Sequence, residues 1–181
     1  AQFLENDGDR YSDDELQSVL ADLMDCRYFE EAERLLEGMA VAGRTWPVNN
    51  VARAQILIEA DRFSAASVML DHLALMHSDN PALFSEAKGL AGRTRKELFL
   101  RALPGNRKAA QVHFTEATRL YNEGRAGDPE KRAWLTSNLL ALRSKGAHEG
   151  MQLDRWFDAE AASSQLEAAI ERIPEGERSF F

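Results

Sequence analysis

The chain has 181 residues, of which 44% are hydrophobic and 29% charged, enough apolar material for one domain with a sizeable core. No apolar run approaches the roughly 20 residues of a membrane-spanning helix, and the acidic start lacks the basic and apolar parts of a secretion signal. The net charge of −8 argues against a general nucleic-acid binder, because such proteins usually carry an excess of basic residues that neutralises phosphates.

Two helix pairs are predicted in the first half of the chain, over residues 13–42 and 46–78. An acidic lead-in, residues 1–12, precedes them and ends at Ser12. Ser12 and Glu15 have the spacing of a capping box, which marks the start of a helix. Apolar residues then recur at i, i+3, i+4 and i+7, so each helix should bury one face.

Two further helix pairs are predicted over residues 82–124 and 129–173, followed by a tail, residues 175–181. The third pair begins with a long helix, because no breaker interrupts it before Pro104. No strand pattern of useful length appears in the sequence. We therefore expect an all-α fold of about eight helices in four antiparallel pairs, forming one repeat domain over residues 13–174 and curving into a short superhelix.

Residues 28–32 (YFEEA) and 62–66 (RFSAA) share one pattern, and Ala32 and Ala66 are 34 positions apart. Each alanine lets the first helix of its pair approach closely, while the phenylalanine three positions earlier fills the corner. A helix-pair period of this length is typical of tetratricopeptide repeats, which the chain therefore resembles. Such pairs stack in arrays and present a concave surface to another molecule. The pattern favours binding over catalysis.

A second resemblance rests on three later stretches. Residues 86–96 contain G-L-A-G-R-T-R-K, residues 114–124 contain A-T-R-L-Y, and residues 134–142 read W-L-T-S-N-L-L-A-L. Together they are similar to the TRAFs-binding segment of the apoptosis-signal-regulating MAP kinase kinase kinases and its bacterial relatives, over about residues 50–145. Where those relatives have Gly-Ile before the asparagine, this chain has Thr136-Ser137.

In that family the segment is a regulatory, protein-binding region. It often lies next to a kinase domain, or next to a trypsin-like or caspase-like protease domain, in a longer chain. The resemblance therefore implies an interaction module of a bacterial signalling or defence-type protein, with a kinase or protease domain in the same chain or complex.

Basic residues gather between Lys88 and Lys108, a segment that we call the basic strip. It carries a net charge of +6 against −14 for the rest of the chain, which together make −8. Its basic residues are Lys88, Arg93, Arg95, Lys96, Arg101, Arg107 and Lys108. They could clasp a carboxylate or phosphate, or steer an acidic protein partner. Alternatively, they form a solvated face paired with acidic residues of the same chain.

Polar residues on predicted first helices are further candidates, because first helices line the concave side of tetratricopeptide arrays. The predicted partner-binding residues are Asn49, Asn50, Arg53, Lys88, Arg93, Lys96 and Asn138. The asparagines could equally cap a helix or face water. Gly89 and Gly92 each cost a helix about 1 kcal/mol relative to alanine, so either close helix packing or a ligand at the backbone should compensate.

Residues that could support catalysis or bind a metal are dispersed. His72 and His77 are five positions apart, which does not put both on one helix face, and no cluster of Cys and His residues supplies further ligands. No set of nucleophile, base and orienting group is visible. We therefore expect no metal, no cofactor and no enzymatic activity. The lone Cys26 cannot form an internal disulfide, which fits a reducing cytoplasm.

The leading hypothesis is a non-enzymatic scaffold that binds a protein or peptide within a larger signalling or defence-type assembly, its basic strip attracting an acidic partner. One alternative is a sensor of a small anionic ligand such as a nucleotide, whose phosphate Arg93, Lys96 and Arg101 would hold. Another is a structural spacer between catalytic domains, which should bind nothing.

Overall fold

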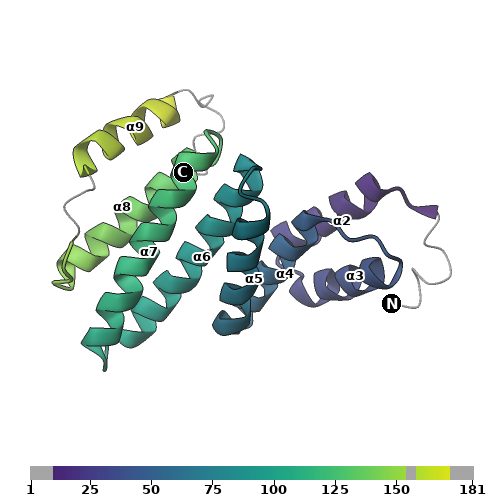
Figure 1. The fold of residues 1–181 in the computed structure, drawn as a ribbon, viewed down its shortest axis with the longest axis horizontal. Coiled ribbons are helices and arrows are strands. Elements are labelled where there is room, and N and C mark those ends of the chain that lie inside the picture. Colours follow the sequence, from purple (N-terminus) through teal and green to yellow (C-terminus); the bar gives the residue numbers. More distant parts are fainter. Residues whose placement is uncertain (1–9, 154–157, 172–181) are drawn as a thin grey trace. The chain divides into compact units, whose positions relative to one another are not determined.

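The computed structural model describes residues 10–153 and 158–171 (Figure 1). Within these ranges the chain forms eight α-helices and no strand, which confirms the all-α prediction. The helices are α2 (Asp13–Asp25), α3 (Phe29–Val41), α4 (Pro47–Glu59), α5 (Phe63–Met76), α6 (Pro81–Ala102), α7 (Arg107–Gly127), α8 (Arg132–His148) and α9 (Ala159–Glu171). None of the described helices is both long and apolar enough to cross a membrane. The predicted tail and most of the predicted lead-in lie outside the described residues.

The chain divides into two compact units, and the boundary falls inside α5. Unit 1 ends at Met69, and unit 2 begins at Leu70. The sequence predicts one repeat domain over residues 13–174 and gives no signal for this boundary. A physical reason lies in unit 2, where α6 and α7 are much longer than the helices of unit 1 and pack closely on each other. The predicted superhelix stays a prediction.

Helix starts follow local capping chemistry. The capping box predicted at the start of α2 is present, because the Glu15 amide donates to Ser12 Oγ at 3.2 Å and the Ser12 amide donates to Glu15 Oε2 at 2.8 Å. At α6 and α7, the side chains of Asn80 and Asn106 accept hydrogen bonds from amides three residues on, at 3.1 and 3.0 Å.

Two helix ends differ from the predicted pairs. The pair predicted over 82–124 extends to Gly127, because Ser85 Oγ donates to the Gly124 carbonyl and accepts from the Asp128 amide, both at 2.8 Å. These bonds satisfy backbone groups at the end of α7. The next helix was predicted from residue 129 and begins at Arg132, since an Asp128 carboxylate oxygen accepts the Glu130 amide at 3.0 Å and holds a turn.

The repeat pattern of the sequence recurs in the backbone of unit 1. Arg27 after α2 and Asp61 after α4 are the only described non-glycine residues with positive φ, at 61° and 60°. Each donates its own amide to the carbonyl three residues back at 3.1 Å, and the next amide donates to a carbonyl five residues back at 2.8 Å. The same left-handed helix stop also ends α3 at Gly43 and follows α8 at Gly150, but its two non-glycine occurrences are separated by the spacing between Ala32 and Ala66.

Each unit has its own apolar core. In unit 1, α2, α3 and α4 meet through a cluster that contains the fully buried Ala32, as the repeat pattern predicts. In unit 2, α6 and α7 meet at Phe99 and Phe114, whose ring centroids lie 5.5 Å apart, and Leu135 and Leu139 of α8 join that cluster. The described residues of both cores are predominantly apolar, so burial supplies most of the stabilisation.

Gly43→Ala should lower the free energy of unfolding by about 1 kcal/mol, because Gly43 ends α3 with φ +71° and a side chain is disfavoured in that left-handed region. No atom lies within 4 Å of an added Cβ, so the cost comes from the backbone alone. Urea denaturation measures it. Gly105→Ala is the matched control, since Gly105 has equally open surroundings without a positive φ, and an equal loss there would contradict the explanation.

Candidate functional site

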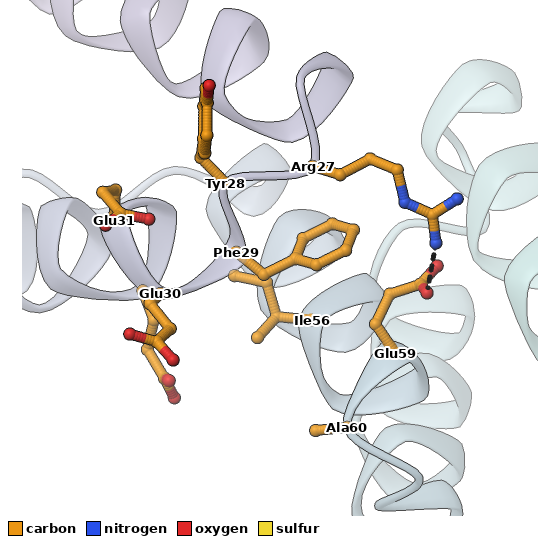
Figure 2. Close-up of a pocket in the computed structure, with 9 residues that line it drawn as sticks. Arg27, Tyr28, Phe29, Glu30, Glu31, Ile56, Glu59 and Ala60 are labelled. Carbon is orange, nitrogen blue, oxygen red and sulfur yellow. Dashed lines mark hydrogen bonds and ion pairs between the residues drawn. The ribbon is translucent and has the colours of Figure 1, made fainter.

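An open pocket of about 470 Å³ lies in unit 1, between the α2–α3 turn, the start of α3 and the end of α4 (Figure 2). We call it the unit 1 pocket. Its aromatic and apolar lining comes from Tyr28, Phe29, Ile56 and Ala60. Ile56 belongs to the buried cluster of unit 1 and Phe29 packs against that cluster, so the apolar part of the pocket rests on the core. The pocket walls are therefore held by the fold.

One ion pair spans the unit 1 pocket. Arg27 Nη2 donates to Glu59 Oε2 at 2.9 Å, and the same guanidinium lies 5.7 Å from the ring centroid of Phe29 (Figure 2). The left-handed stop at Arg27 turns the chain directly before Phe29, and α4 brings Glu59 from 32 residues away. The arrangement thus combines a carboxylate with an aromatic ring around one cation.

Three further glutamates line the unit 1 pocket from the first turns of α3, namely Glu30, Glu31 and Glu33. Carboxylates there interact favourably with the positive end of the helix dipole. Arg34 lies 3.6 Å from Glu30 and 3.9 Å from Glu31, but all three side chains are more than half exposed. Such surface pairs are worth about 0–1 kcal/mol. The pocket therefore holds four carboxylates and one guanidinium.

The lining of the unit 1 pocket offers binding and no evident covalent chemistry. It contains no serine, cysteine, histidine or lysine. Tyr28 stands beside it with 59% of its surface exposed and makes no side-chain cap to α3. Among the described residues, no three His, Cys, Asp or Glu side chains group closely enough to hold a metal ion. What the pocket provides is aromatic contact, an apolar floor and negative charge.

In unit 1, two of the predicted partner-binding residues make hydrogen bonds within the unit. Asn49 is buried and its Nδ2 donates to the Arg44 carbonyl at 3.3 Å, while Oδ1 has no partner. Arg53 Nη2 donates to the Leu36 carbonyl at 2.9 Å and so ties α4 to α3. Asn50 is exposed. None of the three lines the unit 1 pocket.

In unit 2, the structure brings two predicted residues together. Lys96 Nζ of α6 donates to Asn138 Oδ1 of α8 at 3.4 Å, and Asn138 Nδ2 donates to the Trp134 carbonyl at 3.0 Å. Burial lowers the pKa of the Lys96 ammonium, and the nearby Arg93 lowers it further, although Glu97 acts in the opposite direction. Arg93 is half-buried and also interacts within the chain.

Other residues of the basic strip are likewise paired within unit 2. Lys88 Nζ lies 2.8 Å from Glu123 Oε2 and 5.5 Å from the ring centroid of Phe84. Glu123 also pairs with Arg119 of its own helix. Arg107 Nη2 donates to two carbonyls after the end of α8, at 2.8 and 2.9 Å. Several cations of the basic strip thus hold α6, α7 and α8 together.

Side chains fill the space beside the two glycines of α6. A Cβ added at Gly89 would lie 2.4 Å from the ring of Trp134 and 2.7 Å from Leu135 of α8. At Gly92 it would lie 2.9 Å from the ring of Tyr121 of α7. The sequence leaves open whether these glycines allow close helix packing or admit a ligand, and in the structure they allow close helix packing.

The unit 1 pocket was not among the predicted sites. Its signal in the sequence is the run from Arg27 to Glu31, which places a cation, two aromatic rings and two acids in succession. Residues 28–32, which overlap this run, also carry the repeat pattern. The contribution of Glu59 depends on tertiary structure, because α4 must pack against α3 before the carboxylate meets Arg27.

Gly89→Ala should destabilise the protein by about 1–2 kcal/mol. Overpacking costs about 1–3 kcal/mol, and alanine regains up to about 1 kcal/mol of helix propensity. Adding Trp134→Phe should recover part of the loss, because it removes indole atoms that the new Cβ would meet. Urea denaturation of the two single variants and the double variant measures the coupling. Additive effects would show that Gly89 and Trp134 are independent.

Glu116→Gln should lower stability at neutral pH. The hydrogen bond from Arg119 holds the pKa of Glu116 below its ordinary value of 4.5, so the carboxylate contributes stability above that pH and loses it as pH falls through the lowered value. Denaturation at a series of pH values should show the difference from wild type shrinking to nothing in acid. Glu130→Gln is the control, because Glu130 forms no ion pair among the described residues.

No protein-family model, curated protein or solved structure matches this chain. The resemblances to tetratricopeptide repeats and to the TRAFs-binding segment therefore stay predictions made from the residues themselves.

Proposed function

We propose that this chain is a non-enzymatic protein-interaction module that receives a segment of a partner protein in the unit 1 pocket. The pocket is the observation that carries the proposal. Its apolar floor is continuous with the core, and the exposed Tyr28 stands at its side. Aromatic side chains on a firmly held surface are typical anchors of protein interfaces.

The openness of the unit 1 pocket favours a protein segment over a small molecule. Small-molecule sites usually enclose most of their ligand, whereas this pocket lies open beside two helix ends. An extended or helical segment can place one or two side chains in such a pocket and run on across the neighbouring surface.

The positions of two helix stops agree with a tandem arrangement of helix pairs. Arg27 and Asp61 end successive first helices in the same way, one repeat period apart, as expected for tandem helix pairs. Helical repeats present extended binding surfaces. With the resemblance to the TRAFs-binding segment, this favours a place in a cytoplasmic signalling or defence-type assembly of bacteria, beside a kinase or protease domain.

The two alternatives have weaker support. A nucleotide sensor needs cations ready to hold phosphate, but Lys96 donates to Asn138, and Arg93 and Arg101 also interact within the chain. The same pairing weakens the idea of an acidic partner on the basic strip. A structural spacer does not require an open pocket, nor an exposed aromatic side chain such as Tyr28 beside it.

The test is selection from a displayed library of random peptides on the immobilised chain, followed by measurement of Kd in solution. Selected segments should lose at least about tenfold in affinity on Tyr28→Ala, because an aromatic anchor is removed. Val112→Ala is the matched control: Val112 is an apolar residue of α7 with 61% exposure, against 59% for Tyr28. Circular dichroism establishes that both variants fold.

Two results contradict the proposal. One is a selection that enriches no binding segment. The other is a set of segments whose affinity is unchanged by Tyr28→Ala or is reduced equally by Val112→Ala, since the unit 1 pocket would then not be the site.

A further inference from the structure

The unit 1 pocket already binds a guanidinium, that of its own Arg27. The group lies over the ring of Phe29, 5.7 Å from its centroid, and donates to Glu59 at 2.9 Å. A planar guanidinium is suited to this combination, because it can stack on an aromatic ring while its edge donates to a carboxylate. The contacts of Arg27 therefore show one kind of group that fits the pocket, a guanidinium.

The ion pair between Arg27 and Glu59 is weak, because Arg27 is largely exposed to water. Its side chain is 70% exposed, whereas that of Glu59 is only 17% exposed at the end of α4. An exposed guanidinium gains little from a single carboxylate, because water competes for both groups. A cation from another molecule that brings further contacts can therefore displace Arg27 from Glu59.

The rest of the unit 1 pocket adds negative charge. Glu33 forms no ion pair among the described residues, and Glu30 meets only the exposed Arg34, at 3.6 Å. In Figure 2, Phe29 lies between the Arg27–Glu59 pair and the carboxylates of Glu30 and Glu31. An occupant thus meets an aromatic ring with carboxylates on either side. Charge complementarity favours a positive segment, and an acidic one would face repulsion.

We propose that the unit 1 pocket binds a cationic segment of a partner protein through an arginine side chain. That guanidinium replaces Arg27 between Phe29 and Glu59, and basic residues flanking it meet Glu30, Glu31 and Glu33. This inference rests on the proposed function and specifies the chemistry of its partner.

The probes are three labelled peptides of equal length, in which leucine alternates with arginine, with serine or with glutamate. Fluorescence anisotropy with the full chain measures each Kd. The arginine peptide should bind at least about tenfold more tightly than the other two. Glu30→Lys should reduce that preference, and adding Glu59→Gln should remove most of what is left.

Glu37→Lys is the control for non-specific attraction to an acidic protein. Glu37 is exposed on the same helix as Glu30 and does not line the pocket, so this variant makes the same charge reversal outside the site. It should leave the preference for the arginine peptide nearly unchanged. An equal loss with Glu37→Lys would show that general charge, and not the pocket, attracts the peptide.

Arg27→Asn gives the sharpest result. Asparagine tolerates the left-handed backbone at this position and removes the competing guanidinium, so affinity for the arginine peptide should rise severalfold. A fall in affinity would overturn the inference, because Arg27 would then be a contact for the partner.

The two proposals fail in different ways. Library-selected segments that depend on Tyr28 but are neutral or acidic would overturn the cationic partner and leave the interaction module in place. If no selected or designed peptide binds at the unit 1 pocket, the proposed function itself fails.

Discussion

The left-handed helix stop at Arg27 is the constraint on which the unit 1 pocket depends. It reverses the chain within a few residues, so that the arginine side chain and the ring of Phe29 lie beside each other at the start of α3. Any slower turn would separate them and move both away from Glu59 on α4. The left-handed backbone conformation costs a non-glycine residue about 1–2 kcal/mol. With arginine instead of glycine at this position, the pocket has a guanidinium next to Phe29 and Glu59.

Unit 2 is organised by a different constraint, the close approach of long helices at glycines. Gly89 and Gly92 admit the rings of Trp134 and Tyr121, which brings α7 and α8 close enough for hydrogen bonds and ion pairs with α6. The half-buried Lys96 and Lys88 then need partners, since a desolvated charge without one is costly. Because these lysines bind residues of α7 and α8, the basic strip helps to hold the helices of unit 2 together.

Helix positions followed from the sequence because their signals are local. Ser12 with Glu15, and Pro81 at the first position of α6, act within a few residues, so the predicted starts of these helices lie close to the observed ones. The unit boundary inside α5 and the partners of Lys88 and Arg53 depend on contacts between helices, which periodicity does not specify. The pocket joins residues 32 positions apart and was missed for the same reason.

The helix stops at Arg27 and Asp61 in unit 1 have the same backbone conformation but different side-chain chemistry. Arg27 is followed by Tyr28 and an acidic helix start, whereas Asp61 is followed by Arg62 and the small residues Ser64 and Ala65. The charge at the left-handed position is inverted between the two, while both backbone hydrogen bonds keep the same lengths. The backbone stop and the side chains around it are therefore set by different positions of the sequence. The side chains at such a turn can therefore be exchanged without changing the two hydrogen bonds that end the helix.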